Sequence, residues 1–375
     1  MSIYLDNAAT TKLDPRVLQD MLPFLKNSYG NASSLHAQGQ IARQAIEDAR
    51  RVISKKIHSL PEEIIFTSGG TESNNLAILG AAQKLRKHGN HIITSQIEHS
   101  SILNACRELS LRNFRVTYLP VTREGIINPE VLENAITKKT VLVSLMHVNN
   151  ETGAVQNVSS FAEICKRKKV LFHTDCVQFF LKVPFSLKKI PADFVSLSAH
   201  KIHGPKGIGA LFVRKKESLH PLFFGGKQEY ALRPGTENVS GIVGFSKAAL
   251  LLKKEDCERM HGLYKKCIKG LLHISGITIN GTTFQNVQSI INFSAAHVPS
   301  EDLLQYLNCK GIYVSAASAC SSHKKGSYVL EALGLTQSQS ENSIRLSLSK
   351  FTTSKEISNA LEEIKKICNS VQKVT

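Results

Sequence analysis

The stretch SLSAHKIHGPKGIGALFV, residues 196–213, contains two short apolar runs joined by a turn rich in glycine and proline. The first run ends at Ser198, and Lys201 lies at the start of the turn. Short apolar runs that are bounded by turn residues are typical of buried β-strands. We therefore expect two adjacent strands of a buried sheet here, with a lysine directly after the first strand.

Apolar runs of the same kind recur upstream and alternate with segments of helical spacing. A helix should begin after Asp14, because aspartate is a good N-cap and Pro15 suits the first helical position. Strands that alternate with helices predict an α/β fold with a mainly parallel sheet covered by helices on both faces. We expect helices at 36–57, 72–89, 100–113, 129–137 and 158–168, and strands at 63–68, 91–99, 114–121, 140–148, 169–175, 193–200 and 209–214.

The pattern changes after about residue 250. A long polar helix is expected over 251–273, followed by short strands and by helices near 300–309 and 355–371. We therefore predict a large domain over 14–252. A smaller α+β domain would be formed by residues 1–13 together with 253–375.

The composition is typical of a soluble globular protein, with 42% hydrophobic and 21% charged residues in 375. No run approaches the roughly 18 apolar residues of a membrane span, and MSIYLDNAATT lacks the features of a secretory signal, which favours the cytoplasm. The net charge of +17 comes from short clusters such as Lys166–Lys169, without interleaved aromatic residues. These features favour a solvated basic surface over nucleic-acid binding, with acidic protein partners as the alternative.

A lysine and an acid follow separate buried runs. Asp175 and Gln178 lie at the end of VLFHTDCVQ, residues 170–178, and Lys201 follows the run that ends at Ser198. A lysine amine can form a Schiff base with pyridoxal phosphate (PLP), and a carboxylate can hold the pyridine nitrogen protonated. The pair therefore indicates a PLP site.

Other polar residues also follow predicted strands. In TSGGTES, residues 67–73, Gly70 and Thr71 could form a phosphate cup at a helix N-terminus, or an ordinary glycine turn. His99 could stack on a flat ring or move protons, and Asn150 could hydrogen-bond an aromatic oxygen; each could equally be structural. Their joint position favours function, because parallel sheets bind ligands at the carboxyl edge. Ser198 and His200 could donate to the phosphate.

Two candidates come from the C-terminal part. Arg345, in a strand-like run, could bind a carboxylate with two hydrogen bonds, or form a surface salt bridge. Cys320 lies among small residues near His323 and Lys324, where the pKa of a thiol can fall; an ordinary loop cysteine is an equal alternative. The eight cysteines include no CxxC pair and fit no zinc module, so we expect no permanent metal site.

These motifs together resemble the cysteine desulfurases of the IscS/NifS type, in the class V aminotransferase group of fold-type I PLP enzymes. The resemblance runs along the whole chain: YLDNAATT at 4–11, GNASSLH at 30–36, FTSGGTESNNLAI at 66–78, ITSQIEHSSIL at 93–103, SLMHVNNETGAVQ at 144–156, HTDCVQ at 173–178, SLSAHKIHGPKGIGAL at 196–211, RPGTENV at 233–239, SACSSHKKGSYVLEALG at 318–334 and SIRLSLSKFTT at 343–353.

The resemblance implies a role for each site residue. Lys201 would form the Schiff base, and Cys320, on a mobile loop at about 316–328, would be the nucleophile that becomes a persulfide. Thr236 would reach the phosphate from the partner subunit, which implies a homodimer. The remaining roles are phosphate binding by Gly70, Thr71, Ser198 and His200, ring stacking by His99, the pyridinium contact by Asp175, the ring-hydroxyl contact by Gln178, and substrate carboxylate binding by Asn150 and Arg345.

The resemblance also implies the reaction, which converts L-cysteine to L-alanine. The sulfur would pass from Cys320 to an iron–sulfur scaffold protein or into tRNA thiolation, with transient ligation of an iron–sulfur cluster as the one expected metal contact. Departures such as Ala32, SAASAC and HKKG leave the acceptor open. The alternatives are selenocysteine lysis, another class V transfer, and a sulfur-carrier or RNA-associated protein with a vestigial site.

Overall fold

The computed structural model describes residues 2–316 and 326–372 of the chain. Its larger sheet has seven strands in the order β2-β8-β7-β6-β5-β3-β4. The strands are β2 Ile64–Thr67, β3 His91–Ser95, β4 Arg115–Leu119, β5 Thr140–Ser144, β6 Leu171–Asp175, β7 Phe194–Ser198 and β8 Gly209–Val213.

The five strands from β4 to β7 are parallel to their neighbours, which confirms the predicted mainly parallel sheet. Strand β8 is antiparallel to both β7 and β2. The turn between β7 and β8 spans residues 199–208, which is shorter than the dozen or so residues of a parallel crossover, so the chain must return antiparallel. The carboxyl ends of β3, β5, β6 and β7 consequently meet at one edge.

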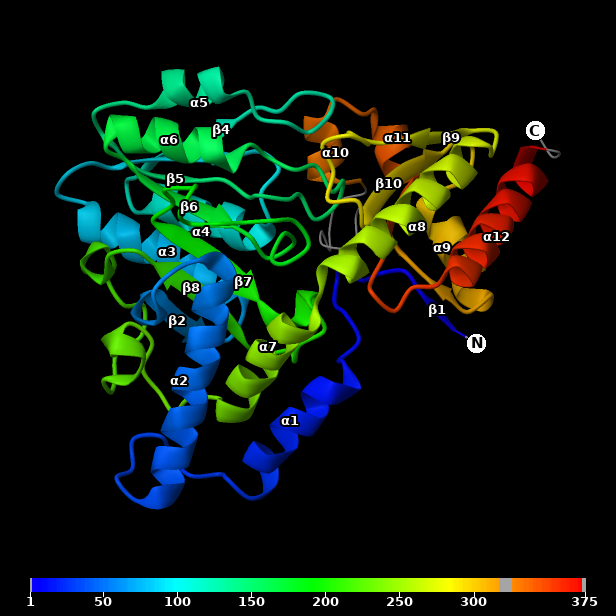
Figure 1. Ribbon diagram of the computed structural model, residues 1–375. Helices are drawn as coiled ribbons and strands as arrows, with labels where there is room; N and C mark the ends of the chain where they lie inside the picture. The colour runs from blue at the N-terminus through cyan, green and yellow to red at the C-terminus, as the bar shows by residue number, and fades with distance from the viewer. Residues whose placement is uncertain (1, 317–325, 373–375) are drawn as a thin grey trace.

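Helices cover both faces of this sheet (Figure 1). Successive residues of β5 enter different apolar clusters: Val143 belongs to one cluster with Phe161 and Phe245, whereas Leu142 belongs to another with Leu76 and Cys106. The helices of this part are α1 Pro15–Lys26, α2 Ala37–Ile57, α3 Gly70–Leu85, α4 Ser100–Leu111, α5 Pro129–Ala135, α6 Val158–Lys168 and α7 Val239–Leu251.

The start of α1 follows the prediction. The Asp14 carboxylate accepts the backbone N–H of Arg16 at 3.0 Å, as an N-cap does. Its other oxygen lies 2.7 Å from Nζ of Lys350 in a buried ion pair. The arginine, followed by the lysine, holds the pKa of Asp14 well below its usual range despite burial. One side chain therefore begins the helix and fixes it to the C-terminal part of the chain.

The second part contains a four-stranded antiparallel sheet in the order β12-β13-β10-β9, and the two-stranded pair β1-β11. Ile3 and Leu5 enter an apolar cluster with residues of this part, such as Leu263 and Ile344, although they lie at the opposite end of the sequence. The predicted domain limits stay predictions. The elements are β1 Ile3–Tyr4, α8 Lys254–Leu272, β9 Ile277–Ile279, β10 Ile290–Ala295, α9 Ser300–Cys309, β11 Ile312–Tyr313, β12 Ser315–Ala316, α10 Tyr328–Ala332, α11 Gln337–Glu341, β13 Ser343–Ser347 and α12 Ser354–Gln372.

The long helix expected over 251–273 is confirmed as α8, which starts three residues later than expected. Helix α7 ends at Leu251 and α8 begins at Lys254, because Leu252 has an extended backbone with ψ of 116°. Helix α7 was not predicted at all; its sequence VSGIVGFSKAALL is apolar on most sides and lacks the polar stripe of an amphipathic helix. Among the described helices, none combines the length and apolar character that a membrane span needs.

Candidate active site

A cavity of about 440 Å³ lies at the carboxyl edge of the large sheet. It brings together side chains that follow β3, β5, β6 and β7, the first residues of α3, and one residue of β13. The roles of these residues stay predictions, but their common position follows from the parallel sheet. Ten of the twelve predicted site residues line it: Gly70, Thr71, His99, Asn150, Asp175, Gln178, Ser198, His200, Lys201 and Arg345.

Lys201 ends a one-turn 3₁₀ helix directly after β7. Its Nζ donates to the carbonyl oxygens of Ala8 at 2.5 Å and Ala9 at 2.7 Å. Burial lowers the pKa of the amine to about 7, with further lowering by the cations Lys182 and Arg345. A substantial fraction of Lys201 is therefore an uncharged amine near neutral pH, which is the nucleophilic form.

A chain of hydrogen bonds links Asp175 to His99. Nδ2 of Asn74 donates to Asp175 Oδ2 at 2.7 Å and to Oγ of Ser101 at 2.9 Å. Oγ of Ser101 lies 2.8 Å from Nδ1 of His99. The other oxygen of Asp175 accepts the backbone N–H of Val177 at 2.8 Å. The sequence had not singled out Asn74 or Ser101, which connect residues from two strands.

The two histidines of the cavity are held as neutral rings. Burial lowers the pKa of His99, Lys201 lowers it further, and Asp175 opposes them. The backbone N–H of Ser101 donates to Nδ1 of His99 at 3.2 Å, so the neutral ring carries its proton on Nε2. Burial, followed by Lys201, lowers the pKa of His200 to about 4.

The start of α3 lines a hollow whose chemistry would suit an anion. Gly70, Thr71, Ser198 and His200 also line an adjoining cavity of about 410 Å³ together with Lys206. The first turn of a helix has unpaired N–H groups and a partial positive charge. A Cβ at Gly70 would lie 2.6 Å from Cγ2 of Val177, so this close approach requires glycine. The four residues predicted to bind a phosphate thus share one cationic hollow.

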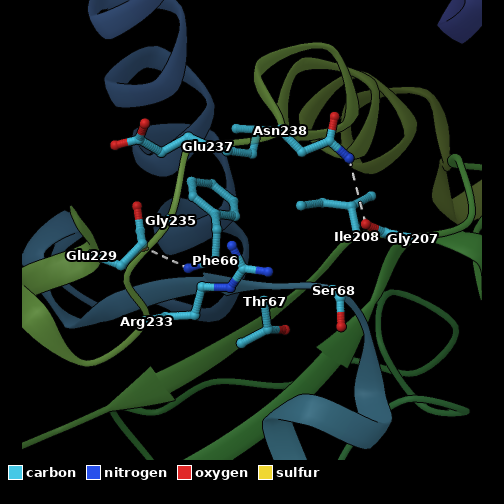
Figure 2. Close-up of a pocket in the computed structure, with 11 residues that line it drawn as sticks. Phe66, Thr67, Ser68, Gly207, Ile208, Glu229, Arg233, Gly235, Glu237 and Asn238 are labelled. Atoms are coloured by element: carbon cyan, nitrogen blue, oxygen red, sulfur yellow. Dashed lines mark hydrogen bonds between the residues drawn. The ribbon is translucent and has the colours of Figure 1, made fainter. Parts of the chain in front are cut away.

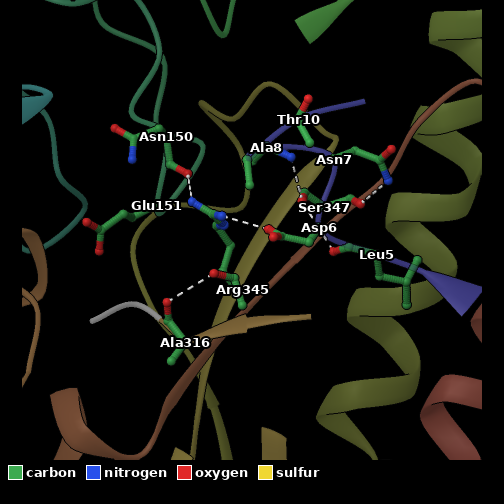
Figure 3. A network of polar contacts seen from close by, with 12 residues as sticks. Leu5, Asp6, Asn7, Ala8, Thr10, Asn150, Glu151, Ala316, Arg345 and Ser347 are labelled. Carbon is green, nitrogen blue, oxygen red and sulfur yellow. Dashed lines mark hydrogen bonds and ion pairs between the residues drawn. The ribbon is translucent and has the colours of Figure 1, made fainter. Parts of the chain in front are cut away.

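Arg345 is fixed by two contacts on the opposite side of the cavity (Figure 3). Its Nη1 donates to the carbonyl oxygen of Asn150 at 2.9 Å, and its Nη2 lies 2.8 Å from Oδ1 of Asp6. The position of Asp6 comes from β1 and from the backbone bond of Ser347 to Leu5 at 2.6 Å. Asp6 lies in the motif YLDNAATT at 4–11, from which no role for it was predicted.

Four polar atoms of the cavity are buried and have no hydrogen-bond partner among the described residues: Oδ1 of Asn74, Oδ1 of Asn150, Oγ of Ser198 and Nε of Arg345. Buried polar atoms are normally bonded, because leaving them unpaired costs free energy. Such atoms indicate a polar ligand. A cationic hollow for a phosphate, a carboxylate for a ring nitrogen and a lysine amine fit PLP.

Two predicted residues are not among those lining this cavity. Thr236 lines a different hollow with Arg233 and Phe224, and Figure 2 shows its neighbours Gly235 and Glu237 near Arg233. Its contact with a partner's phosphate stays a prediction. Cys320 lies within 317–325, outside the described residues. The last strand before that segment, β12, contributes Ser315 to the cavity.

Comparison with known proteins confirms the resemblance. The cysteine desulfurase IscS of Dictyoglomus turgidum is 43% identical over 378 residues, which cover 100% of this chain and 96% of the relative. The IscS of Methanosarcina thermophila is 42% identical and covers 100% and 94%. A solved NifS-like protein is 38% identical with a TM-score of 0.93, covering 98% of this chain and 100% of that one.

A second solved structure, described as SspA in complex with cysteine, is 34% identical with a TM-score of 0.85 and covers 94% of this chain and 100% of that one. The model of the family described as Aminotransferase class-V matches residues 3–360. With nearly the whole chain matched, this protein belongs to the class-V aminotransferase family.

Proposed function

We propose that this protein is a PLP-dependent cysteine desulfurase, which converts L-cysteine to L-alanine and holds the sulfur as a persulfide on Cys320. The observation that carries the proposal is the amine of Lys201, whose pKa is lowered to about 7, in one cavity with Asp175 and the cationic hollow at α3. Full-length similarity to relatives named cysteine desulfurase supports it.

The cavity offers a group for each part of the cofactor. Asp175 would pair with the ring nitrogen, Gln178 would donate to the ring hydroxyl, His99 would stack on the ring, and Lys201 would hold the aldehyde carbon. The phosphate would bind to Gly70, Thr71, Ser198 and His200, and to Thr236 of a second copy in a homodimer. When bound, PLP supplies an electron sink that stabilises negative charge at the α-carbon of an amino acid.

The chain's own residues bind the substrate, move the proton and hold the site residues in position. Arg345 binds the carboxylate of cysteine, since its Nε donor is buried and unpaired among the described residues. Asn150 would add a second donor through its amide Nδ2. The amine of Lys201 would be placed to take the α-proton, for which its pKa of about 7 is well suited. The hydrogen bonds through Asn74 and Ser101 hold Asp175 and His99 in place.

The sulfur step balances without a further reactant. The Cys320 thiolate attacks Sγ of the substrate, an S–S bond forms, and the C–S bond breaks. The electron pair stays with the carbon fragment, which takes up protons and leaves as alanine. The persulfide passes to an acceptor thiol by exchange. Iron–sulfur scaffold proteins and the tRNA thiolation system are the proposed acceptors.

The test uses purified protein loaded with PLP. Borohydride reduction and peptide mapping should place a pyridoxyl adduct on Lys201, and Lys201→Ala should remove the cofactor absorbance band. Cys320→Ala should keep the band and stop sulfide release, whereas Cys309→Ala, at an exposed cysteine of α9, should change neither. An adduct elsewhere, or undiminished release from Cys320→Ala, would overturn the proposal. Activity that requires a 2-oxo acid would favour amino-group transfer instead, and release of selenide alone would favour selenocysteine lysis.

A further inference from the structure

The N-cap residue of α10, Ser327, and its first residue, Tyr328, are hydrogen-bonded to two loops that line the cavity. Oγ of Ser327 donates to Oε2 of Glu151 at 2.5 Å, and the hydroxyl of Tyr328 donates to the carbonyl oxygen of Glu98 at 2.6 Å. Glu151 directly follows Asn150, and Glu98 directly precedes His99. Helix α10 is thus bonded to the neighbours of two proposed site residues.

The hydroxyl of Ser327 has a second task at the same place. Its oxygen accepts the backbone N–H groups of Val329 at 3.2 Å and Leu330 at 3.3 Å, and so caps α10. The backbone N–H of Ser327 donates to Oγ of Ser340 at 2.7 Å. Ser327 and Glu151 are only 2% and 3% exposed, so water cannot readily replace these bonds. The cap therefore fixes the helix start relative to Glu151.

The two loops are also bonded to each other. Nδ2 of Asn149 donates to the carbonyl oxygen of Ile97 at 2.9 Å. Oδ1 of Asn149 accepts the backbone N–H groups of Glu151 and Thr152, both at 2.9 Å. Asn149 itself is fully buried. The loop after β3 and the loop after β5 therefore form one connected platform under α10.

Apolar contacts join the same partners. Val329 of α10 and Leu333, the residue directly after the helix, form a small buried cluster with Ile97 and Met146, and Tyr328 packs against it. Met146 also lines the cavity. Helix α10 thus docks on the platform with an apolar face and with two hydrogen bonds at its first turn.

Helix α10 is the first described helix after Cys320 in the sequence. The helix begins eight residues after Cys320 in the sequence, and Gly326 and Ser327 are the two described residues that directly precede it. Gly326 has a φ of +98°, a conformation that favours glycine. Whatever holds Ser327 and Tyr328 in place therefore sets the point from which the chain reaches back to Cys320.

We propose that Ser327 and Tyr328, with Glu151 as the acceptor of the Ser327 bond, are positioning residues that hold the start of α10 against the loops bearing His99 and Asn150. This inference rests on the proposed function. Their loss slows the transfer of sulfur to Cys320 and leaves cysteine binding unchanged, because the bonds of Arg345 to Asp6 and Asn150 do not involve them.

The experiment compares Tyr328→Phe and Ser327→Ala with wild-type holoenzyme at pH 8. Burial raises the pKa of Glu151 to about 7, so at pH 8 the carboxylate is ionised and accepts the bond. Tyr306→Phe is the matched control, because its hydroxyl donates to Oε2 of Glu363 at 2.9 Å, away from the cavity. Ser110→Ala, at an exposed residue of α4 whose hydroxyl donates to the carbonyl oxygen of Cys106, is the second control.

Three quantities are measured: amide hydrogen exchange over residues 329–333, KM for cysteine, and the single-turnover rate of persulfide formation on Cys320 by mass spectrometry. The loss of one hydrogen bond is expected to raise the equilibrium constant for local opening of α10 about fivefold, and the amide exchange rate by the same factor. The persulfide rate should fall by a similar factor in Tyr328→Phe and Ser327→Ala, with KM and the cofactor absorbance unchanged. Ser327→Thr, which keeps the hydroxyl, should restore the wild-type rate.

Wild-type persulfide rates in both variants, despite faster exchange, would overturn the inference, since the bonds would then be structural only. A rise in KM with an unchanged rate would overturn it as well. If Ser327→Ala does not fold, Glu151→Gln, which keeps an acceptor oxygen of the same size, replaces it with the same two readouts. Failure of the wild type to form a persulfide would instead overturn the proposed function.

Discussion

The two edges of the seven-stranded sheet carry the same kind of side chain in opposite surroundings. At the carboxyl edge, Lys201 is held in a cavity where burial and neighbouring cations lower its pKa to about 7. At the amino edge, exposed lysines precede the strands, such as Lys138 and Lys139 before β5 and Lys169 before β6. The comparison shows that the surroundings, and not the residue type, decide which lysine can act as a nucleophile.

The orientation of the helices explains the basic amino edge. Helices in a parallel sheet run opposite to the strands, so they end at the amino edge, where cations stabilise the helix dipole. Lys166, Arg167 and Lys168 lie in the last turn of α6, and Lys55 and Lys56 in the last turn of α2. Part of the net charge of +17 is therefore a solvated surface with a structural use.

The largest expected effect separates the two edges directly. Lys201→Ala should lower kcat for cysteine by at least about a thousandfold, because the proposed roles of the amine are both to anchor the cofactor and to move the α-proton. Lys169→Ala, the same change at the amino edge, should leave kcat within about twofold. Steady-state alanine production by both variants checks the comparison, and a strong loss in Lys169→Ala would break it.

Arginines give the next largest contrast. Arg345→Lys should lower kcat/KM by about tenfold to a hundredfold, because lysine lacks the planar guanidinium whose three separate nitrogens face Asn150, Asp6 and the proposed carboxylate. Arg167→Lys, at the amino edge, keeps a cation near Glu133 and should leave kcat/KM unchanged. Cysteine titrations of the rate measure both, and an unaffected Arg345→Lys would exclude its proposed substrate contact.

The lowered pKa of Lys201 predicts a pH dependence for PLP uptake. The neutral amine rises from about a tenth of Lys201 at pH 6 to about nine-tenths at pH 8. The rate at which cofactor-free protein takes up PLP should therefore increase about tenfold over this range and level off above pH 8. Stopped-flow absorbance records it. A rate that still rose steeply between pH 9 and 10 would show an ordinary lysine pKa.

The smallest expected effects are changes in the free energy of unfolding, and they compare an amino-edge lysine in a loop with one at the end of a helix. Lys139→Ala, in a loop, should change the free energy of unfolding by no more than about 0.5 kcal/mol. Lys168→Ala should cost about 0.3–1 kcal/mol, because this lysine lies at the end of α6 and 3.4 Å from Glu133. Urea unfolding measures both, and 0.5 M salt should reduce the cost at Lys168. Equal values at low salt would contradict the helix-end explanation.

The sequence could predict Lys201, Asp175 and His99 because each follows an apolar run, and the order of such runs fixes the edge at which they meet. It could not predict Asn74, whose bond to Asp175 joins residues 101 positions apart. The pair of asparagines in ESNNLAIL was the available signal, since a polar residue in an otherwise apolar helix needs a partner.

Other features depend on tertiary contacts that no local pattern contains. Helix α7 is buried among α1, α2 and the sheet, so its sequence has no polar face to reveal its period. Asp6 becomes part of the cavity because β1 pairs with β11, more than three hundred residues away in sequence. Thr236 does not contact the cavity in one chain, and its predicted contact needs a second copy.

The N-terminal segment has a practical consequence for expression of the protein. The carbonyl oxygens of Ala8 and Ala9 bond the amine of Lys201, Asp6 holds Arg345, and Ile3 and Leu5 enter the apolar cluster of the second part. A start codon chosen ten residues downstream would delete one wall of the cavity while leaving every other motif intact. Gene boundaries and affinity tags at this end must therefore spare the first dozen residues.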